Sequence, residues 1–196
     1  MSDSVGTWWR PLSFGLAAAV LWVACASAQT PLSERITQCT TCHGENGNSR
    51  IENIPSLAGQ PEFFVLNQLF LMREGVRQVA VMMPFVKDLT DDDLNALAGH
   101  FSKLSPKRSG EPIDPALVKR GEELAALRRC GSCHLSTLTG QQQMPRLAKQ
   151  RIDFLNTTMK AFRDSPRRGA DTLMSAAVVG LSEDDILALA HYAASR

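Results

Sequence analysis

Cysteine, aromatic residues and charge of one sign are all scarce in this sequence. Its 196 residues include five cysteines and one tyrosine, and the formal net charge is +1. A charge this close to zero argues against nucleic acid as a partner, because nucleic-acid binding needs a strongly basic surface. The alternating pattern of half-buried strands is also missing, and apolar residues recur at helical spacing instead. The sequence therefore predicts an all-α fold, in a chain long enough for one large domain or two small ones.

Only one long apolar run occurs, and it lies near the N-terminus. Arg10 precedes the run at 14–24, and Ala26-Ser-Ala28 supplies the small residues of a cleavage site. The run is short for a membrane span, which needs about 20 residues. We predict a signal peptide over residues 1–28, cleaved after Ala28, and export to the periplasm. An uncleaved N-terminal anchor and a lipoprotein site at Cys25 are the alternatives.

The four cysteines that remain after cleavage form two Cys-x-x-Cys-His motifs and leave none for a structural disulfide. Two thiols at this spacing can bond the two vinyl groups of a haem, and the adjacent histidine can reach the iron. We expect each motif at the start of a helix. The sequence thus predicts two covalent haem c groups. Their attachment residues are Cys39, Cys42, Cys130 and Cys133, and their proximal iron ligands are His43 and His134.

Two other readings compete for the paired cysteines. A single zinc site would need four thiolates that converge, and a redox-active dithiol belongs in a βαβ context. Neither reading explains why a histidine follows each pair, or why the chain downstream of each pair is duplicated.

The chain downstream of the signal peptide is an internal repeat. The first Cys-x-x-Cys-His recurs 91 residues later, the block 55–60 recurs 90 residues later, and the block 89–98 recurs 92 residues later. The stretch between the copies contains three prolines and a glycine, which is linker composition. We therefore predict an N-terminal domain at 29–104, a linker at 105–115 and a C-terminal domain at 116–196.

Each copy has the pattern of a small helical domain. We expect helices at 32–39, 62–73, 116–129 and 152–163, and a last helix in each copy. Thr90 and Ser182 precede the last helices as N-caps, with Asp93 and Asp185 three positions on. Domains of this size have a marginal apolar core, which a buried haem would complete.

The repeat also nominates the sixth iron ligand. Met174 lies seven residues before Leu181, and the same offset before Leu89 leads to Met82. Met83 is the close rival of Met82, because it adjoins it and precedes a proline. Histidine and methionine together fill both axial positions, which favours electron transfer over oxygen chemistry.

Other candidate side chains receive simpler roles. We assign three further methionines to the core and two histidines to helix surfaces. They are Met72, Met144, Met159, His100 and His191. The ring N–H groups of the two proximal histidines need acceptors, and the backbone carbonyls of Pro55 and Pro145 lie at matching positions.

These residues resemble the dihaem cytochromes c of the cytochrome c4 type, periplasmic proteins of two class I cytochrome c domains related by pseudo-symmetry. The resemblance rests on Cys39–His43 followed by two glycines, on the block 55–60, and on Met82-x-Pro84 ahead of Leu-Thr-Asp-Asp-Asp. It covers nearly all of the chain after the signal peptide. It implies that Met82, rather than Met83, holds the ligand position.

The second copy departs from the pattern of that family. Leu135-Ser-Thr-Leu138 stands where the first copy has its glycines, and Lys149 replaces Gly59. We therefore expect the second haem site to differ from the first in solvent exposure and reduction potential.

The function expected from these features is that of a periplasmic electron carrier, not an enzyme. It would pass single electrons between respiratory redox partners, for example toward a terminal oxidase, as a monomer that meets the membrane only through its partners. Residues 29–104 have a net charge of −3 and residues 105–196 one of +4, which would orient docking. One alternative is a dihaem subunit of a periplasmic dehydrogenase complex, such as a flavocytochrome c type enzyme. The other is a haem enzyme such as a peroxidase, which requires an open axial position.

Overall fold

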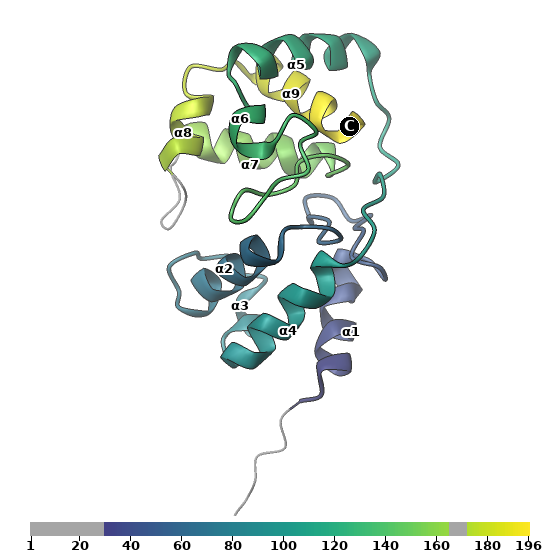
Figure 1. Cartoon of the computed structure of the whole chain (residues 1–196), viewed down its shortest axis with the longest axis vertical. Helices are drawn as coiled ribbons and strands as arrows, with labels where there is room; N and C mark the ends of the chain where they lie inside the picture. Colours follow the sequence, from purple (N-terminus) through teal and green to yellow (C-terminus); the bar gives the residue numbers. More distant parts are fainter. Residues whose placement is uncertain (1–29, 165–171) are drawn as a thin grey trace, which may run out of the picture.

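The computed structural model describes residues 30–164 and 172–196, so the predicted signal peptide lies outside the described part. The described chain is helical, with one isolated bridge between Gln141 and Met144. No helix in these residues is long and apolar enough to cross a membrane. Figure 1 shows two lobes stacked along the long axis of the molecule, with the connecting chain running along one side.

The N-terminal lobe contains four helices. They are α1 (Leu32–His43), α2 (Glu62–Arg73), α3 (Met83–Val86) and α4 (Asp91–Ser102). Helix α4 packs against both α1 and α2. Leu94, Leu97 and Phe101 project from α4 into the core of this lobe, where each is at most 2% exposed. The helical spacing of apolar residues in the sequence therefore marks the buried face of α4.

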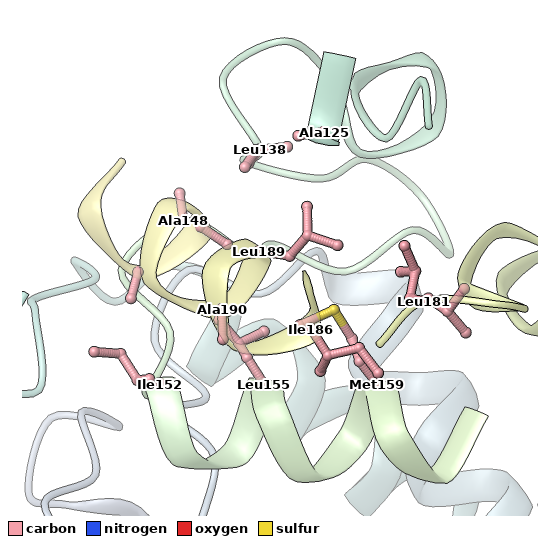
Figure 2. Packing of buried hydrophobic residues seen from close by; sticks show 13 residues of the cluster. Ala125, Leu138, Ala148, Ile152, Leu155, Met159, Leu181, Ile186, Leu189 and Ala190 are labelled. Atoms are coloured by element: carbon pink, nitrogen blue, oxygen red, sulfur yellow. The ribbon is translucent and has the colours of Figure 1, made fainter. Parts of the chain in front are cut away.

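The C-terminal lobe contains the other five described helices. They are α5 (Pro115–Leu127), α6 (Gly131–His134), α7 (Ile152–Asp164), α8 (Thr172–Val178) and α9 (Glu183–Ser195). Helix α9 packs on both α5 and α7. Figure 2 shows Ile186, Leu189 and Ala190 of α9 lying over Leu155 and Met159 of α7. Small residues on α9 allow this helix to be buried between two neighbours.

The last helix of each lobe begins with the capping box expected from the sequence. The side chains of Thr90 and Ser182 accept from the backbone N–H of Asp93 and Asp185, and both carboxylates bond back to the cap residue. Helix α5 has a cap that the sequence reading did not identify, because Asp114 accepts from two N–H groups of its first turn. These caps satisfy backbone donors that have no partner within the helix.

Helices α5 and α9 cross at a glycine. A Cβ atom placed on Gly121 would lie 2.1 Å from the carbonyl oxygen of Ala188 and 2.6 Å from the Cβ of Tyr192. Only a residue without a side chain allows this separation of the two backbones. Gly121 therefore sets the distance between α5 and α9.

The two lobes keep the same backbone path even where the second one has lost its glycines. Three positions have a positive φ in both copies, with glycine in the first copy and a larger residue in the second. They are Gly44 and Leu135 (87° and 67°), Gly47 and Leu138 (67° and 56°), and Gly59 and Lys149 (64° and 58°). Left-handed backbone costs a residue with a Cβ roughly 1–2 kcal/mol. The second lobe therefore retains the loop geometry at a local cost in stability.

Two buried glutamines join the lobes through a reciprocal arrangement. The side-chain amide of Gln60 donates to the carbonyl of Arg146 (3.0 Å) and accepts from its N–H (2.9 Å). In the same way, the amide of Gln150 donates to the carbonyl of Ser56 (2.9 Å) and accepts from its N–H (2.8 Å). Gln60 and Gln150 occupy equivalent repeat positions, as do Ser56 and Arg146. The junction is thus pseudo-symmetric and fixes one loop of each lobe against the other.

A second set of contacts lies beside the glutamines. The N–H of Asn53 donates to the carboxylate of Asp153 (3.2 Å), and the hydroxyl of Thr157 donates to the side-chain oxygen of Asn53 (2.9 Å). From the connecting segment, the Glu111 carboxylate accepts from the N–H groups of Ile152 and Asp153 at the start of α7. The lobes therefore have a defined relative orientation.

Candidate haem sites

The first Cys-x-x-Cys-His motif ends helix α1. The expectation of a motif at a helix start is wrong here, because α1 continues through both cysteines and ends at His43. The His43 side chain is buried, and its Nδ1 lies 2.8 Å from the carbonyl oxygen of Pro55. A carbonyl can only accept, so Nδ1 carries the proton and Nε2 is free to bind a metal. The predicted role of the Pro55 carbonyl is confirmed.

The second motif has the same histidine geometry on a different helical frame. Helix α5 ends at Leu127, and after a left-handed residue at Arg129 the motif forms the short helix α6. The Nδ1 of buried His134 lies 2.9 Å from the carbonyl oxygen of Pro145, as predicted. The helix expected at 116–129 therefore ends two residues earlier than predicted, at Leu127, and the short helix α6 was not predicted.

Burial shifts the titration of the motif side chains. It lowers the pKa of His43 and His134, and the bonds to Pro55 and Pro145 oppose this effect. Burial also raises the pKa of the Cys39 thiol. The pKa of Cys130 is raised for the same reason. Thiols of a redox-active dithiol have the opposite shift, because the thiolate is the reactive species.

The four cysteines do not converge on one point. Among the described residues, no group of three or more His, Cys, Asp or Glu side chains is arranged to hold a metal ion. The zinc reading requires such a cluster of four ligands, so the geometry of these residues does not fit it.

Both motifs open into one continuous cavity of about 760 Å³. The cavity is lined mainly by apolar side chains, and it extends between the lobes past Gln60, Arg146 and Gln150. Cys39, Cys42 and His43 line it from one lobe, and Cys130, Cys133 and His134 from the other. A large apolar space that meets two thiols and the unbonded edge of a histidine in each lobe fits a covalently attached macrocycle.

The predicted methionines also face this cavity. Met82 lines it at the start of α3, and Met174 lines it from α8. Both Met82 and Met83 pack against the N-terminal core, but Met83 does not belong to the cavity wall. The structure thus places Met82 at the cavity wall and its rival Met83 away from it. Met72, Met144 and Met159 line the cavity too, and Met72 and Met159 are buried core residues as expected.

The two sites differ modestly in exposure. Cys133 is exposed, whereas Cys42 is half-buried, and the two histidines are buried to a similar degree. Apolar side chains reach solvent beside each methionine. Val81 and Phe85 are 60% and 45% exposed at the first site, and Leu173 is 69% exposed at the second, and all three line the cavity. These side chains form an apolar rim beside the two methionines.

The sequence reading missed the most unusual polar side chain of the cavity. Arg146 is only 2% exposed and lies between the lobes, where its Nε donates to the carbonyl of Ala58 (3.1 Å). Its counterpart in the first repeat is Ser56. The one signal in the sequence was an arginine in place of Ser56, which is one of two mismatches in the repeated block, the other being Lys149 in place of Gly59.

Two family models match the chain, one in each lobe. Residues 31–100 match the model described as cytochrome c oxidase, cbb3-type, subunit III, and residues 118–195 match the model described as cytochrome c. Cytochrome c4 from Pseudomonas aeruginosa is 33% identical over 165 residues, covering 79% of this chain and 81% of that protein. The thiosulfate dehydrogenase electron acceptor of Thiomonas intermedia is 29% identical over 198 residues, covering 95% and 91%.

Solved structures show the same likeness. Reduced recombinant cytochrome c4 from Pseudomonas stutzeri has a TM-score of 0.73 at 31% identity, covering 83% of this chain and 96% of that one. The thiosulfate dehydrogenase TsdBA from Marichromatium purpuratum has a TM-score of 0.71 at 26% identity, covering 85% of this chain and 40% of that one. The chain belongs to the cytochrome c4 family, built from two tandem class I cytochrome c domains, and it carries two covalent haem c groups with His/Met ligation.

Proposed function

We propose that this electron-transfer protein is a periplasmic carrier that moves single electrons between respiratory partners. The observation that carries the proposal is the shared cavity, which both motifs and the two nominated methionines line. Two redox centres held in one small body exchange electrons without a diffusive encounter. The reciprocal glutamine contacts support a fixed distance between them.

We assign the cofactor contacts to eight side chains. The thiols of Cys39 and Cys42, and of Cys130 and Cys133, attach the two haems, and the iron ligands are His43 with Met82 and His134 with Met174. When bound, each haem supplies a one-electron iron couple. The Pro55 and Pro145 carbonyls hold the histidine rings so that Nε2 points away from the backbone bond. A histidine and a methionine bound to each iron would leave no position there for a substrate, so the protein would act as a carrier and not as an enzyme.

A matched pair of adjacent variants tests the ligand assignment. Met82→Ala removes the methionine that lines the cavity, and Met83→Ala removes its half-buried neighbour, which does not line it. We expect Met82→Ala to abolish about half of the Met–iron charge-transfer absorbance of the ferric protein, and Met83→Ala to retain it. Loss of the band in Met83→Ala with retention in Met82→Ala would reverse the assignment.

Docking is proposed at the apolar rims beside the two methionines. Val81 and Phe85 lie at the edge of the first site, and the opposite net charges of 29–104 and 105–196 would orient each partner. The rate of oxidation by a purified terminal oxidase should fall as salt is raised, because exposed charges are screened. A rate independent of salt would show that the charge asymmetry has no part in docking.

Export and processing belong to the same proposal. We infer that residues 1–28 are removed after Ala28, leaving domains at 29–104 and 116–196 joined by the segment 105–115. N-terminal sequencing of protein recovered from a periplasmic fraction should begin at Gln29. A mature chain that begins at Met1 would establish a retained anchor instead.

A dihaem subunit of a dehydrogenase complex is the second candidate. Two relatives named thiosulfate dehydrogenase electron acceptor, and the similarity to TsdBA, favour this class of partner. Gel filtration separates the candidates, since a free carrier elutes as a monomer. Rapid reduction by thiosulfate in the presence of a purified thiosulfate dehydrogenase, together with co-elution, would establish the second candidate over a carrier with several partners.

A further inference from the structure

The junction between the lobes holds a buried cation whose charge is not balanced by the protein. Arg146 is 2% exposed, and its guanidinium donates to two backbone carbonyls, those of Ala58 and Ala148. Its Nη2 is buried and has no hydrogen-bond partner among the described residues. Among the described residues, no carboxylate forms an ion pair with Arg146.

Such an arrangement is costly unless an anion completes it. Burial lowers the pKa of Arg146 to about 10, and no acidic side chain offsets the effect. Arginine remains protonated even so, and a buried charge without a counter-charge is destabilising. The two carbonyls satisfy part of the hydrogen-bonding capacity but do not neutralise the charge. A carboxylate could accept a hydrogen bond from Nη2 and would supply the missing charge.

The cavity holds a cofactor with carboxylates of its own. Each haem carries two propionates, its only anionic side groups, and Arg146 lines the same cavity as both Cys-x-x-Cys-His motifs. The neighbouring Pro145 orients the second proximal histidine, while Nε of Arg146 reaches across to the first lobe. The guanidinium of Arg146 therefore lies between the two haem sites, at the junction of the lobes. The pseudo-symmetric position, Ser56, has no charge, so this cation occurs once.

We propose that the Arg146 guanidinium binds a haem propionate at the junction of the two lobes and keeps it ionised. This role is that of a cofactor-binding residue, and it rests on the presence of haem and not on the identity of the redox partner. The cation stabilises the ferrous form of the haem that it faces, because the positive charge opposes further oxidation of the iron. It also holds the propionate unprotonated through the neutral pH range.

The test is a spectroelectrochemical titration of both haems as a function of pH. Arg146→Gln should lower the reduction potential of the haem whose propionate the guanidinium holds, and should make that potential fall as pH rises through neutrality. The pH dependence follows because a buried propionate without its cation has a raised pKa and takes up a proton on reduction. The haem that shifts, first or second, identifies the source of the propionate.

Two further variants separate this role from a general effect on the junction. Arg146→Lys keeps the charge and should restore a potential that varies little with pH. Lys149→Gln removes a charge from a half-exposed position of the same loop and should leave both potentials and their pH dependence unchanged. Haem staining with a haem-to-protein ratio confirms that each variant is loaded.

The outcomes are decisive in either direction. Unchanged potentials and pH dependence in Arg146→Gln, or equal shifts in Lys149→Gln, would overturn the proposal while leaving the electron-carrier function intact. If Arg146→Gln fails to mature, the infrared redox difference spectrum of the wild type with isotope-labelled propionates decides the question. A propionate that takes up a proton on reduction at neutral pH in that spectrum would also overturn it.

Discussion

The glutamines at the junction should contribute more to stability than any exposed polar residue of this protein. Gln60 is 4% exposed, and its amide is bonded to both the N–H and the carbonyl of Arg146. Gln60→Ala leaves two buried backbone groups without those partners. Each unsatisfied group costs about 1–3 kcal/mol, so the expected loss in free energy of unfolding is about 2–6 kcal/mol.

The assay is chemical denaturation of the haem-loaded protein, followed by far-ultraviolet circular dichroism and by haem absorbance. Loss of the junction should also make the two lobes unfold in separate steps, so the transitions from the two probes should no longer coincide. Gln150→Ala tests the pseudo-symmetric half and should have a similar effect, because its amide holds Ser56 in the same way.

Gln78→Ala is the matched control, since Gln78 is exposed and does not line the cavity. Its effect should stay within about 0.5 kcal/mol of the wild type. If Gln60→Ala and Gln150→Ala are no more destabilising than Gln78→Ala, the reasoning about the junction is refuted. Wild-type transitions that already differ between the two probes would refute the claim that the glutamines couple the lobes.

Three further predictions follow from single positions. Gly121→Ala should destabilise the protein by at least about 2 kcal/mol, because its Cβ would overlap the α9 backbone. The control is Gly99→Ala, at a helical glycine with room for a Cβ, which should stabilise the protein by about 0.5–1 kcal/mol. Equal effects of the two variants in thermal melts would contradict this reasoning. Lys149→Gly should stabilise by about 1 kcal/mol in denaturant titrations by relieving a φ of 58°, and a loss of stability would show that the side chain matters more than the backbone. Hydrogen bonds from Ser182 and Arg120 hold the pKa of Asp185 at about 2, against an ordinary value of 3.8. The stability that this carboxylate contributes above pH 3.8 should therefore be lost as the pH falls toward about 2. Asp185→Asn should flatten this part of the pH profile of stability, and an unchanged profile would contradict the role of the carboxylate.

Local patterns in the sequence were sufficient to predict the helical class and most of each site. The spacing of the Cys-x-x-Cys-His motifs and the repeat offsets led to the two haems and nominated Met82 and Met174 as sixth ligands, and the structure shows that both methionines line the cavity. The capping boxes at Thr90 and Ser182 are also local, because their partners lie three residues away. Repeat symmetry succeeded with the Pro55 carbonyl for a similar reason, since the acceptor lies only 12 residues after His43, in the loop that follows α1.

What the sequence could not reveal depends on contacts between the lobes. Gln60 and Gln150 stood in a matched block, but nothing local indicates that each amide bonds to the backbone of the other copy. The replacement of a glycine by Leu135 predicts an altered second site. The structure shows instead that tertiary packing imposes the backbone of Gly44 on a leucine. Arg146 was missed because its importance comes from its burial at the junction, which no local pattern reports.

Exposure of the fully reduced protein to carbon monoxide tests the central claim most directly. If histidine and methionine occupy both axial positions of both haems, the ferrous spectrum should remain unchanged in carbon monoxide, as expected of a carrier with no open position. A carbon monoxide adduct at either haem would show an open or exchangeable site. It would contradict the assignment of Met82 or Met174, and with it the proposal that this protein only carries electrons.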